Sequence, residues 1–159
     1  DPVATRGELA YGFRKILDTG TDEKFVHEYC CQQFVTHKLL KENPEGAAAV
    51  TRALQKASAF VEAEPVEAAR IQIESDLVSG DLEFNSKLLD ELNFIPSRSL
   101  GKKTFEAAAR QLQVAGILKP ETDIDKFVET GYIELPGVPD GYIYDSEKGE
   151  YIEITEPRA

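Results

Sequence analysis

The 159-residue chain contains no methionine and no tryptophan, and it has only two cysteines. It also lacks any run of about 18 consecutive apolar residues, the length that a membrane-spanning helix needs. Cys30 and Cys31 are adjacent, so they cannot form the spaced disulfide framework that stabilises small secreted domains. These absences argue against a membrane-spanning helix and against a disulfide-rich scaffold.

Basic residues are scarce as well. Lysine and arginine number 18 against 29 aspartates and glutamates, which gives a formal net charge of -11. Because such a surface repels a phosphate backbone, the sequence predicts no nucleic-acid partner. A hydrophobic content of 42% is sufficient for a core, and the length suits one ordinary domain. We therefore expect a folded globular chain.

The strongest local signals begin at Asn43. Asn43 is a good N-cap, Pro44 suits the first helical position, and Glu45 complements the positive end of the helix dipole. Helix-forming residues continue to Ala63, and Pro65 ends this helix and can begin the next one. The predicted apolar stripe of the long helix consists of Val50, Leu54, Ala57 and Val61.

Further helices are expected towards the C-terminus. Apolar residues at helical spacing predict a helix over residues 82–92. Thr104 is the expected N-cap of a helix that runs to Ala115, with Gly116 as its C-terminal glycine. Thr122 is the expected cap of a short helix that ends at Gly131. At the other end of the chain, residues 1–4 are expected to be extended because the residue before a proline favours that geometry.

Two regions have the character of β-strands. Tyr29–Val35 carries aromatic and β-branched residues at its ends and fits no helical stripe, so we expect a strand. Gly141–Asp145 and Glu150–Ile154 alternate with period two around the turn at residues 146–149, which predicts a β-hairpin. The sequence therefore favours a helix-rich α/β chain with a C-terminal hairpin.

Three segments resemble a known family. NPEGAAAVTRAL at residues 43–54, EPVEAA at 64–69 and AGILKPETDIDKF at 115–127 are similar to the nitrate, sulfonate and taurine type of ABC-transporter substrate-binding protein. In that family a proline begins a long alanine-rich helix, and a second proline motif begins the next. The resemblance covers about residues 1–135 and implies the C-terminal part of lobe 1 of a type 2 periplasmic-binding-protein fold. Residues 136–159, a linker and the hairpin tail, depart from the family pattern.

The resemblance implies a binding protein and not an enzyme. Its members are solute-binding components of ABC importers, which hold a small organic or anionic solute in a cleft between two hinged lobes. The implied partners are this small-molecule ligand and an ABC permease in the membrane, with no cofactor. The implied location is periplasmic or extracellular, with or without a lipid anchor. Because the chain begins at Asp1 and Pro2 and not at methionine, we expect an N-terminal part of the same protein to precede it, and these two residues are the hinge candidates.

The resemblance also implies that the beginning of the predicted strand faces the ligand cleft. The ligand-binding candidates are therefore Tyr29, Cys30 and Cys31, with Glu28 and His27 near the rim. Tyr29 can stack on a ring or donate its hydroxyl to a ligand, although packing in the core is an equally good explanation for it.

Two alternatives remain open beside this interpretation. The first is a stand-alone helical protein-interaction module, and the second is a thiol- or metal-dependent protein that uses Cys30 and Cys31. Metal sites usually draw on spaced ligands, and neighbouring residues on a strand point to opposite faces, so we predict no metal ligands. Cysteine catalysis needs a base beside the thiol. His27 lies at the start of the predicted strand and is not suitably placed to act as that base, so we predict no catalytic residues. On the plainest interpretation, one cysteine packs in the core and the other faces the cleft or solvent.

Overall fold

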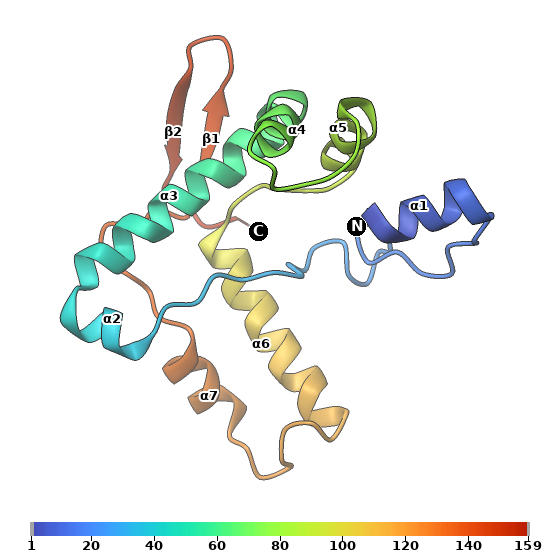
Figure 1. Ribbon diagram of the computed structural model, residues 1–159. Helices are drawn as coiled ribbons and strands as arrows, with labels where there is room; N and C mark the ends of the chain where they lie inside the picture. The colour runs from blue at the N-terminus through green and yellow to red at the C-terminus, as the bar shows by residue number, and fades with distance from the viewer. Residues whose placement is uncertain (1, 159) are drawn as a thin grey trace. The chain divides into compact units, whose positions relative to one another are not determined.

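A computed structural model describes residues 2–158 as a helix-rich chain, with one small antiparallel sheet among them (Figure 1). The helices are α1 (Pro2–Tyr11), α2 (His37–Glu42), α3 (Pro44–Ala63), α4 (Pro65–Glu74), α5 (Leu82–Asp90), α6 (Arg98–Val114) and α7 (Ile124–Gly131). The strands are β1 (Gly141–Asp145) and β2 (Glu150–Ile154). The expected helix-rich character and the C-terminal hairpin are confirmed. None of the helices within residues 2–158 is long and apolar enough to cross a membrane.

The chain forms two compact units, each assembled from three separate stretches of sequence. Among the described residues, the first unit comprises 2–27, 56–95 and 143–152, and the second comprises 28–55, 96–142 and 153–158. Helix α3 and both strands each contribute residues to the two units. The division that we predicted after residue 135 rests on the resemblance and stays a prediction.

The beginnings of α3 and α4 follow the predicted signals. The Asn43 side-chain oxygen accepts a hydrogen bond from the Gly46 N–H at 2.8 Å, and Pro44 occupies the first helical position. Helix α3 ends at Ala63, and Pro65 begins α4. A proline costs little at the first helical position because its missing N–H would have had no intrahelical partner there.

The predicted apolar stripe of α3 is wrong. Val50 and Leu54 are 47% and 50% exposed, whereas Ala47, Ala48 and Ala59 are buried. In the second unit the two neighbouring alanines form a core with Leu135 and Val138, against which Val35, Leu39 and Leu40 pack. Small side chains let other segments approach the backbone of α3 closely, so its alanine face is buried in preference to its larger residues.

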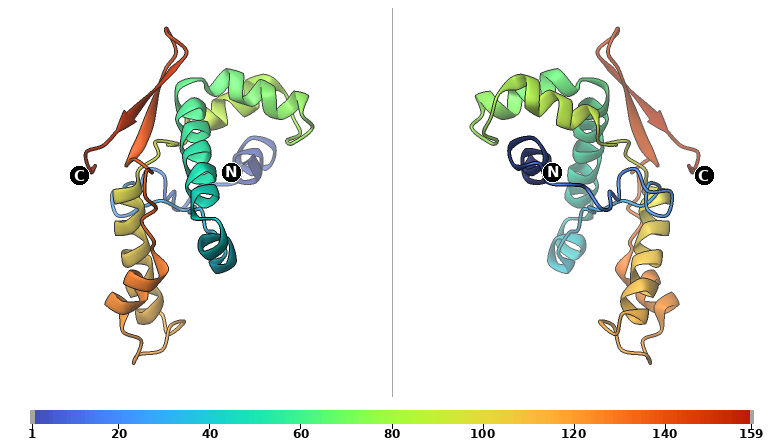
Figure 2. Two further views of the ribbon diagram at one scale, coloured as in Figure 1. Left: turned by 90° about the vertical axis from the view of Figure 1, so that its left-hand side faces the viewer. Right: turned by 90° about the vertical axis from the view of Figure 1, so that its right-hand side faces the viewer.

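Helix α6 begins seven residues earlier than expected. Its N-cap is Ser97, whose hydroxyl accepts a hydrogen bond from the Leu100 N–H, and the predicted cap Thr104 is instead buried within the helix. Asp123, not Thr122, caps α7. Helix α7 lies beside α6 in both views of Figure 2, and the two bury Ala109, Ile124 and Val128.

The N-terminal segment is helical where we expected an extended lead-in. Asp1 lies outside the described residues, and Pro2 is the first residue of α1, a position that its fixed φ angle suits. Within the first unit, the Arg6 guanidinium donates to the Ser79 carbonyl oxygen at 3.2 Å and lies 5.2 Å from the centre of the Phe84 ring. These contacts fasten α1 beside α5.

The β-hairpin turns where the sequence predicted. The Asp145 carboxylate accepts hydrogen bonds from the backbone N–H groups of Glu147 and Lys148, both at 3.1 Å. Gly149 closes the turn with a φ of 68°, which a residue with a side chain adopts only at a cost. The Tyr144 ring lies 5.2 Å from Phe60 and 5.0 Å from Tyr151, so aromatic contacts hold this part of the hairpin in the first unit.

Replacing Gly141 with alanine tests the close approach of two segments in the second unit. A Cβ atom at this position would collide with the carbonyl group of Pro96, which is backbone and cannot rotate away. We expect Gly141→Ala to lower the free energy of unfolding by about 2 kcal/mol, as overpacking does elsewhere. Urea denaturation followed by circular dichroism measures this change. The control is Gly20→Ala, where the new Cβ meets only the Asp18 side chain, and an equal loss in both variants would contradict the expectation.

Candidate functional site

The segment that carries the predicted ligand-binding residues is not a strand. Residues 29–36 are irregular, with a bend at Cys30, and the strand predicted over Tyr29–Val35 is wrong. The described residues contain one sheet, the β1–β2 hairpin, so this segment has no ladder to join there. β-branched and aromatic residues favour a strand only where a neighbouring strand is available to pair with them.

Side-chain hydrogen bonds hold this segment against α6 in place of a ladder. The Tyr29 N–H donates to the Thr104 hydroxyl at 3.1 Å, and the Gln32 side-chain amide donates to the Gly101 carbonyl at 2.9 Å. Gly101 and Thr104 are three residues apart and therefore lie on the same face of α6. The two bonds flank the two cysteines and fix the backbone on each side of them.

The two cysteine side chains point towards each other. Their sulfur atoms are 3.4 Å apart, and both are exposed free thiols. The expectation that they point to opposite faces is wrong, because the alternation of a strand does not apply to this irregular backbone. The hydrogen bond with Cys30 and the charge of its thiolate raise the pKa of the Cys31 thiol above its ordinary value, and partial burial adds to this.

The remaining predicted site residues are spread over the chain. His27 is exposed and belongs to the first unit, whereas Glu28 is half-buried in the second unit and accepts a hydrogen bond from the Gln111 amide at 3.4 Å. The hinge candidate Asp1 lies outside the described residues, and Pro2 begins α1. The structure thus brings Glu28, Tyr29 and the two thiols into one unit.

Tyr29 is half-buried near the beginning of α6. Burial raises the pKa of its phenol, while the charge of Arg158 and a hydrogen bond with Ser97 oppose that shift. Burial also raises the pKa of Tyr132, whose hydroxyl donates to the Arg98 carbonyl oxygen at 2.7 Å. Both phenols therefore keep their protons at neutral pH, and the Tyr132 phenol acts as a hydrogen-bond donor.

The sequence did not predict the buried carboxylate that lies at the beginning of α6. Asp140 is 1% exposed, and its oxygens accept hydrogen bonds from the Ser97 hydroxyl and the Ser99 N–H, each at 2.8 Å. Its own carbonyl oxygen accepts from the Arg98 N–H at 2.6 Å and from the Gln55 amide at 3.2 Å. A carboxylate at a helix N-terminus is stabilised by the helix dipole and by the free N–H groups there.

The hydrogen bonds of this cluster give it a structural role. The Ser97 hydroxyl donates to a carboxylate while it caps the helix, and no histidine or cysteine takes part in these hydrogen bonds. The arrangement fastens the residues before β1 to the first turn of α6. A serine directly after Pro96 was the signal that marked the true helix start, because serine is among the best N-cap residues.

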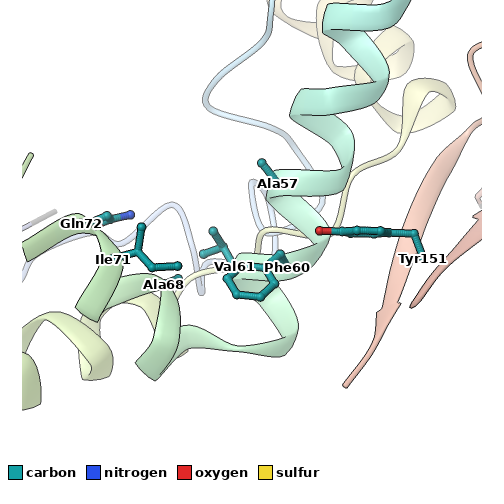
Figure 3. Close-up of a pocket in the computed structure, with 7 residues that line it drawn as sticks. All are labelled: Ala57, Phe60, Val61, Ala68, Ile71, Gln72 and Tyr151. Carbon is teal, nitrogen blue, oxygen red and sulfur yellow. The ribbon is translucent and has the colours of Figure 1, made fainter. Parts of the chain in front are cut away.

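The first unit contains an apolar groove of about 390 Å³ between α3, α4 and the hairpin (Figure 3). Its lining residues are Ala57, Phe60, Val61, Ala68, Ile71, Gln72 and Tyr151. In Figure 3 the Tyr151 ring extends from the hairpin towards α3, and Gln72 supplies the one side-chain amide. Binding sites for small molecules have comparable volumes but usually contain several convergent polar groups.

Neither a metal centre nor a known relative identifies the site. Within residues 2–158 no three histidine, cysteine, aspartate or glutamate side chains gather in a position to hold a metal ion. Comparisons with protein-family models, with curated proteins and with solved structures give no match to the chain. The site has to be interpreted from its own geometry.

Removing the Asp140 carboxylate tests its structural role. Asp140→Ala leaves the Ser97 hydroxyl and the Ser99 N–H without their acceptor, so we expect the free energy of unfolding to fall by about 3 kcal/mol. Urea denaturation measures the change. The matched control is Asp125→Ala, which removes an ion pair to Arg110 from a side chain that is 85% exposed and should cost less than about 1 kcal/mol. Similar losses for the two variants would show that Asp140 has no special role.

The buried phenols predict a loss of stability in alkali. Burial is the largest cause of the raised pKa values of Tyr29, Tyr132, Tyr142 and Tyr151. The folded chain therefore holds these protons more tightly than the unfolded chain does. Their contribution to stability is complete below the unfolded pKa of about 10 and is lost as the pH rises through the folded values.

We expect the free energy of unfolding, measured by urea denaturation at a series of pH values, to fall above about pH 10. A variant with Tyr29→Phe and Tyr132→Phe lacks two of the four phenols, so its decline should be shallower. An unchanged slope in this variant would assign the alkaline loss to other groups.

Proposed function

We propose that the chain is part of the solute-binding component of an ABC importer of the nitrate, sulfonate and taurine type. It forms the C-terminal part of lobe 1 of a type 2 periplasmic-binding-protein fold. The component binds a small organic or anionic solute in an inter-lobe cleft and delivers it to a membrane permease without chemical change. The observation that best supports the proposal is the irregular segment 29–36, which leads directly into the capped helices α2 and α3.

The chemistry of this segment suits the lining of a cleft. Tyr29 is half-buried, with a phenol that keeps its proton, whereas the side chains of residues 30–34 are exposed. Thiols, amides and aromatic rings together offer both apolar contact and hydrogen bonds to a small solute. Glu28 and His27 remain the candidates for the rim.

The helical part of the chain also supports the proposal. The resemblance requires a long alanine-rich helix that begins at a proline and a second helix that begins at another. Helix α3 begins at Pro44 with an Asn43 cap and buries three alanines, and α4 begins at Pro65. These features build the scaffold and do not select the solute.

Exposed apolar side chains near the N-terminus give further support. Val3, Leu9, Tyr11, Phe13 and Ile16 are between 66% and 92% exposed. A large exposed apolar surface usually marks a site of contact with another molecule or another part of the same protein. In the proposed function this contact is with the remainder of the two-lobed protein, exported to the periplasm or the cell surface.

Titration calorimetry tests this proposal directly. The titrants are taurine, longer alkanesulfonates, nitrate and pyrimidines, added to the chain and to a polypeptide extended upstream of residue 1, since the proposal places part of the cleft there. We expect saturable binding of one solute class, which Tyr29→Ala weakens by at least about tenfold, or about 1.4 kcal/mol. Tyr11→Ala, at a 77% exposed tyrosine outside the segment, is the control. Absence of heat with every solute, in protein shown to be folded, would count against the proposal.

A second candidate is a stand-alone helical interaction module, which the same exposed residues favour. The oligomeric state distinguishes the two. A lobe that lacks its complement should self-associate in light scattering, and Ile16→Asp, at a side chain that is 92% exposed, should reduce that association. The upstream-extended polypeptide should be monomeric. A chain that is monomeric by itself at all concentrations would favour the interaction module.

A further inference from the structure

We infer that Cys30 and Cys31 form a two-thiol site that chelates a thiophilic trivalent metalloid, such as an organic arsenic(III) compound, through both sulfur atoms. The inference starts from the convergence of the two side chains. Both thiols are free and exposed, and their sulfur atoms lie 3.4 Å apart. An approaching atom can therefore reach both sulfurs at once.

The separation of the sulfurs selects the kind of atom that can bridge them. With bonds of about 2.3 Å to sulfur, a separation of 3.4 Å corresponds to an angle of about 95° at the bridging atom. This angle is narrower than the tetrahedral arrangement that zinc prefers and suits a pyramidal atom with three bonds. Trivalent arsenic that carries one organic group has that shape and needs two sulfurs to complete it.

Competing uses of the pair are weaker. A structural zinc site requires four ligands, and within residues 2–158 no three potential ligands gather. A disulfide between neighbours is also disfavoured, because consecutive Cα atoms are about 3.8 Å apart and disulfides usually need at least about 4.4 Å. An atom inserted between the sulfurs relieves this constraint by enlarging the ring.

The backbone around the pair is held before any ligand arrives. The bond from the Tyr29 N–H to Thr104 precedes the two cysteines, and the bond from Gln32 to the Gly101 carbonyl follows them. Both acceptors belong to buried residues of α6. A ligand that binds both thiols therefore has less conformational freedom to remove than it would on a mobile loop, which favours affinity.

The reaction with the probe phenylarsine oxide balances without an oxidant. Two S–H bonds break and two As–S bonds form, while the oxygen leaves arsenic as water with the two thiol protons. Arsenic stays trivalent throughout, and no cysteine is oxidised. The raised pKa of Cys31 is compatible with this step, since the protonated thiol supplies one of the protons.

Mass spectrometry of the intact reduced chain provides the test. We expect phenylarsine oxide to add one arsenic per chain and to consume both free thiols in a colorimetric thiol assay. Excess of a monothiol such as 2-mercaptoethanol should leave the adduct in place, whereas a dithiol such as 2,3-dimercaptopropanol should remove it. Two arsenic atoms per chain, or no adduct, would overturn the inference.

Serine variants supply the matched controls. Cys30→Ser and Cys31→Ser each retain one thiol at the same place, so we expect binding at least about 100-fold weaker, with adducts that the monothiol removes. Circular dichroism confirms that the variants are folded. Adducts on the single variants that resist the monothiol as well as the wild-type adduct does would refute chelation. The inference does not rest on the proposed solute-binding function. A negative result in the calorimetry with solutes and a negative result in the arsenic experiment are independent of each other.

Discussion

The buried carboxylate of Asp140 determines where α6 begins, and the geometry of the candidate site depends on that start. Its bonds to Ser97 and Ser99 complete the first turn of the helix and bring the residues before β1 against it. Because the helix starts there, Gly101 and Thr104 are already helical and face the same way. Both residues accept hydrogen bonds from the segment with the thiols. A helix that began at Thr104 would have offered no such pair of acceptors.

Local signals in the sequence were sufficient to predict the structure where the interacting residues are close together in the chain. The cap at Asn43, the prolines that begin α3 and α4, and the alternating hairpin residues all act within a few positions, and the structure has each of them. The start of α6 was missed although Ser97 marked it locally, and the carboxylate that completes its first turn lies 43 residues from Ser97, where no local pattern connects it to the helix. The buried face of α3 was misjudged for a similar reason. Its alanines are buried by Leu135 and Val138, which no local pattern connects to it.

The roles of the predicted site residues stay predictions, and their geometry differs from the one that the sequence indicated. Tyr29 and the two cysteines do lie together in the second unit, yet the assumption of a strand placed the thiols on opposite faces. That assumption weighed against the alternative of a thiol- or metal-dependent protein, which requires both sulfurs. A strand needs a neighbouring strand to pair with as well as suitable residues. The local sequence does not show whether that neighbouring strand is present.

Chelation and strand pairing make opposite demands on the backbone of segment 29–36. Among the described residues the segment joins no ladder. If the proposed solute-binding protein completed a sheet here, a strand from another part of it would pair with the segment. Pairing would impose strand alternation, turn Cys30 and Cys31 to opposite faces and separate the sulfurs that are now 3.4 Å apart. Chelation and strand pairing are therefore mutually exclusive at this segment, so each ligand that favours one of them must oppose the other.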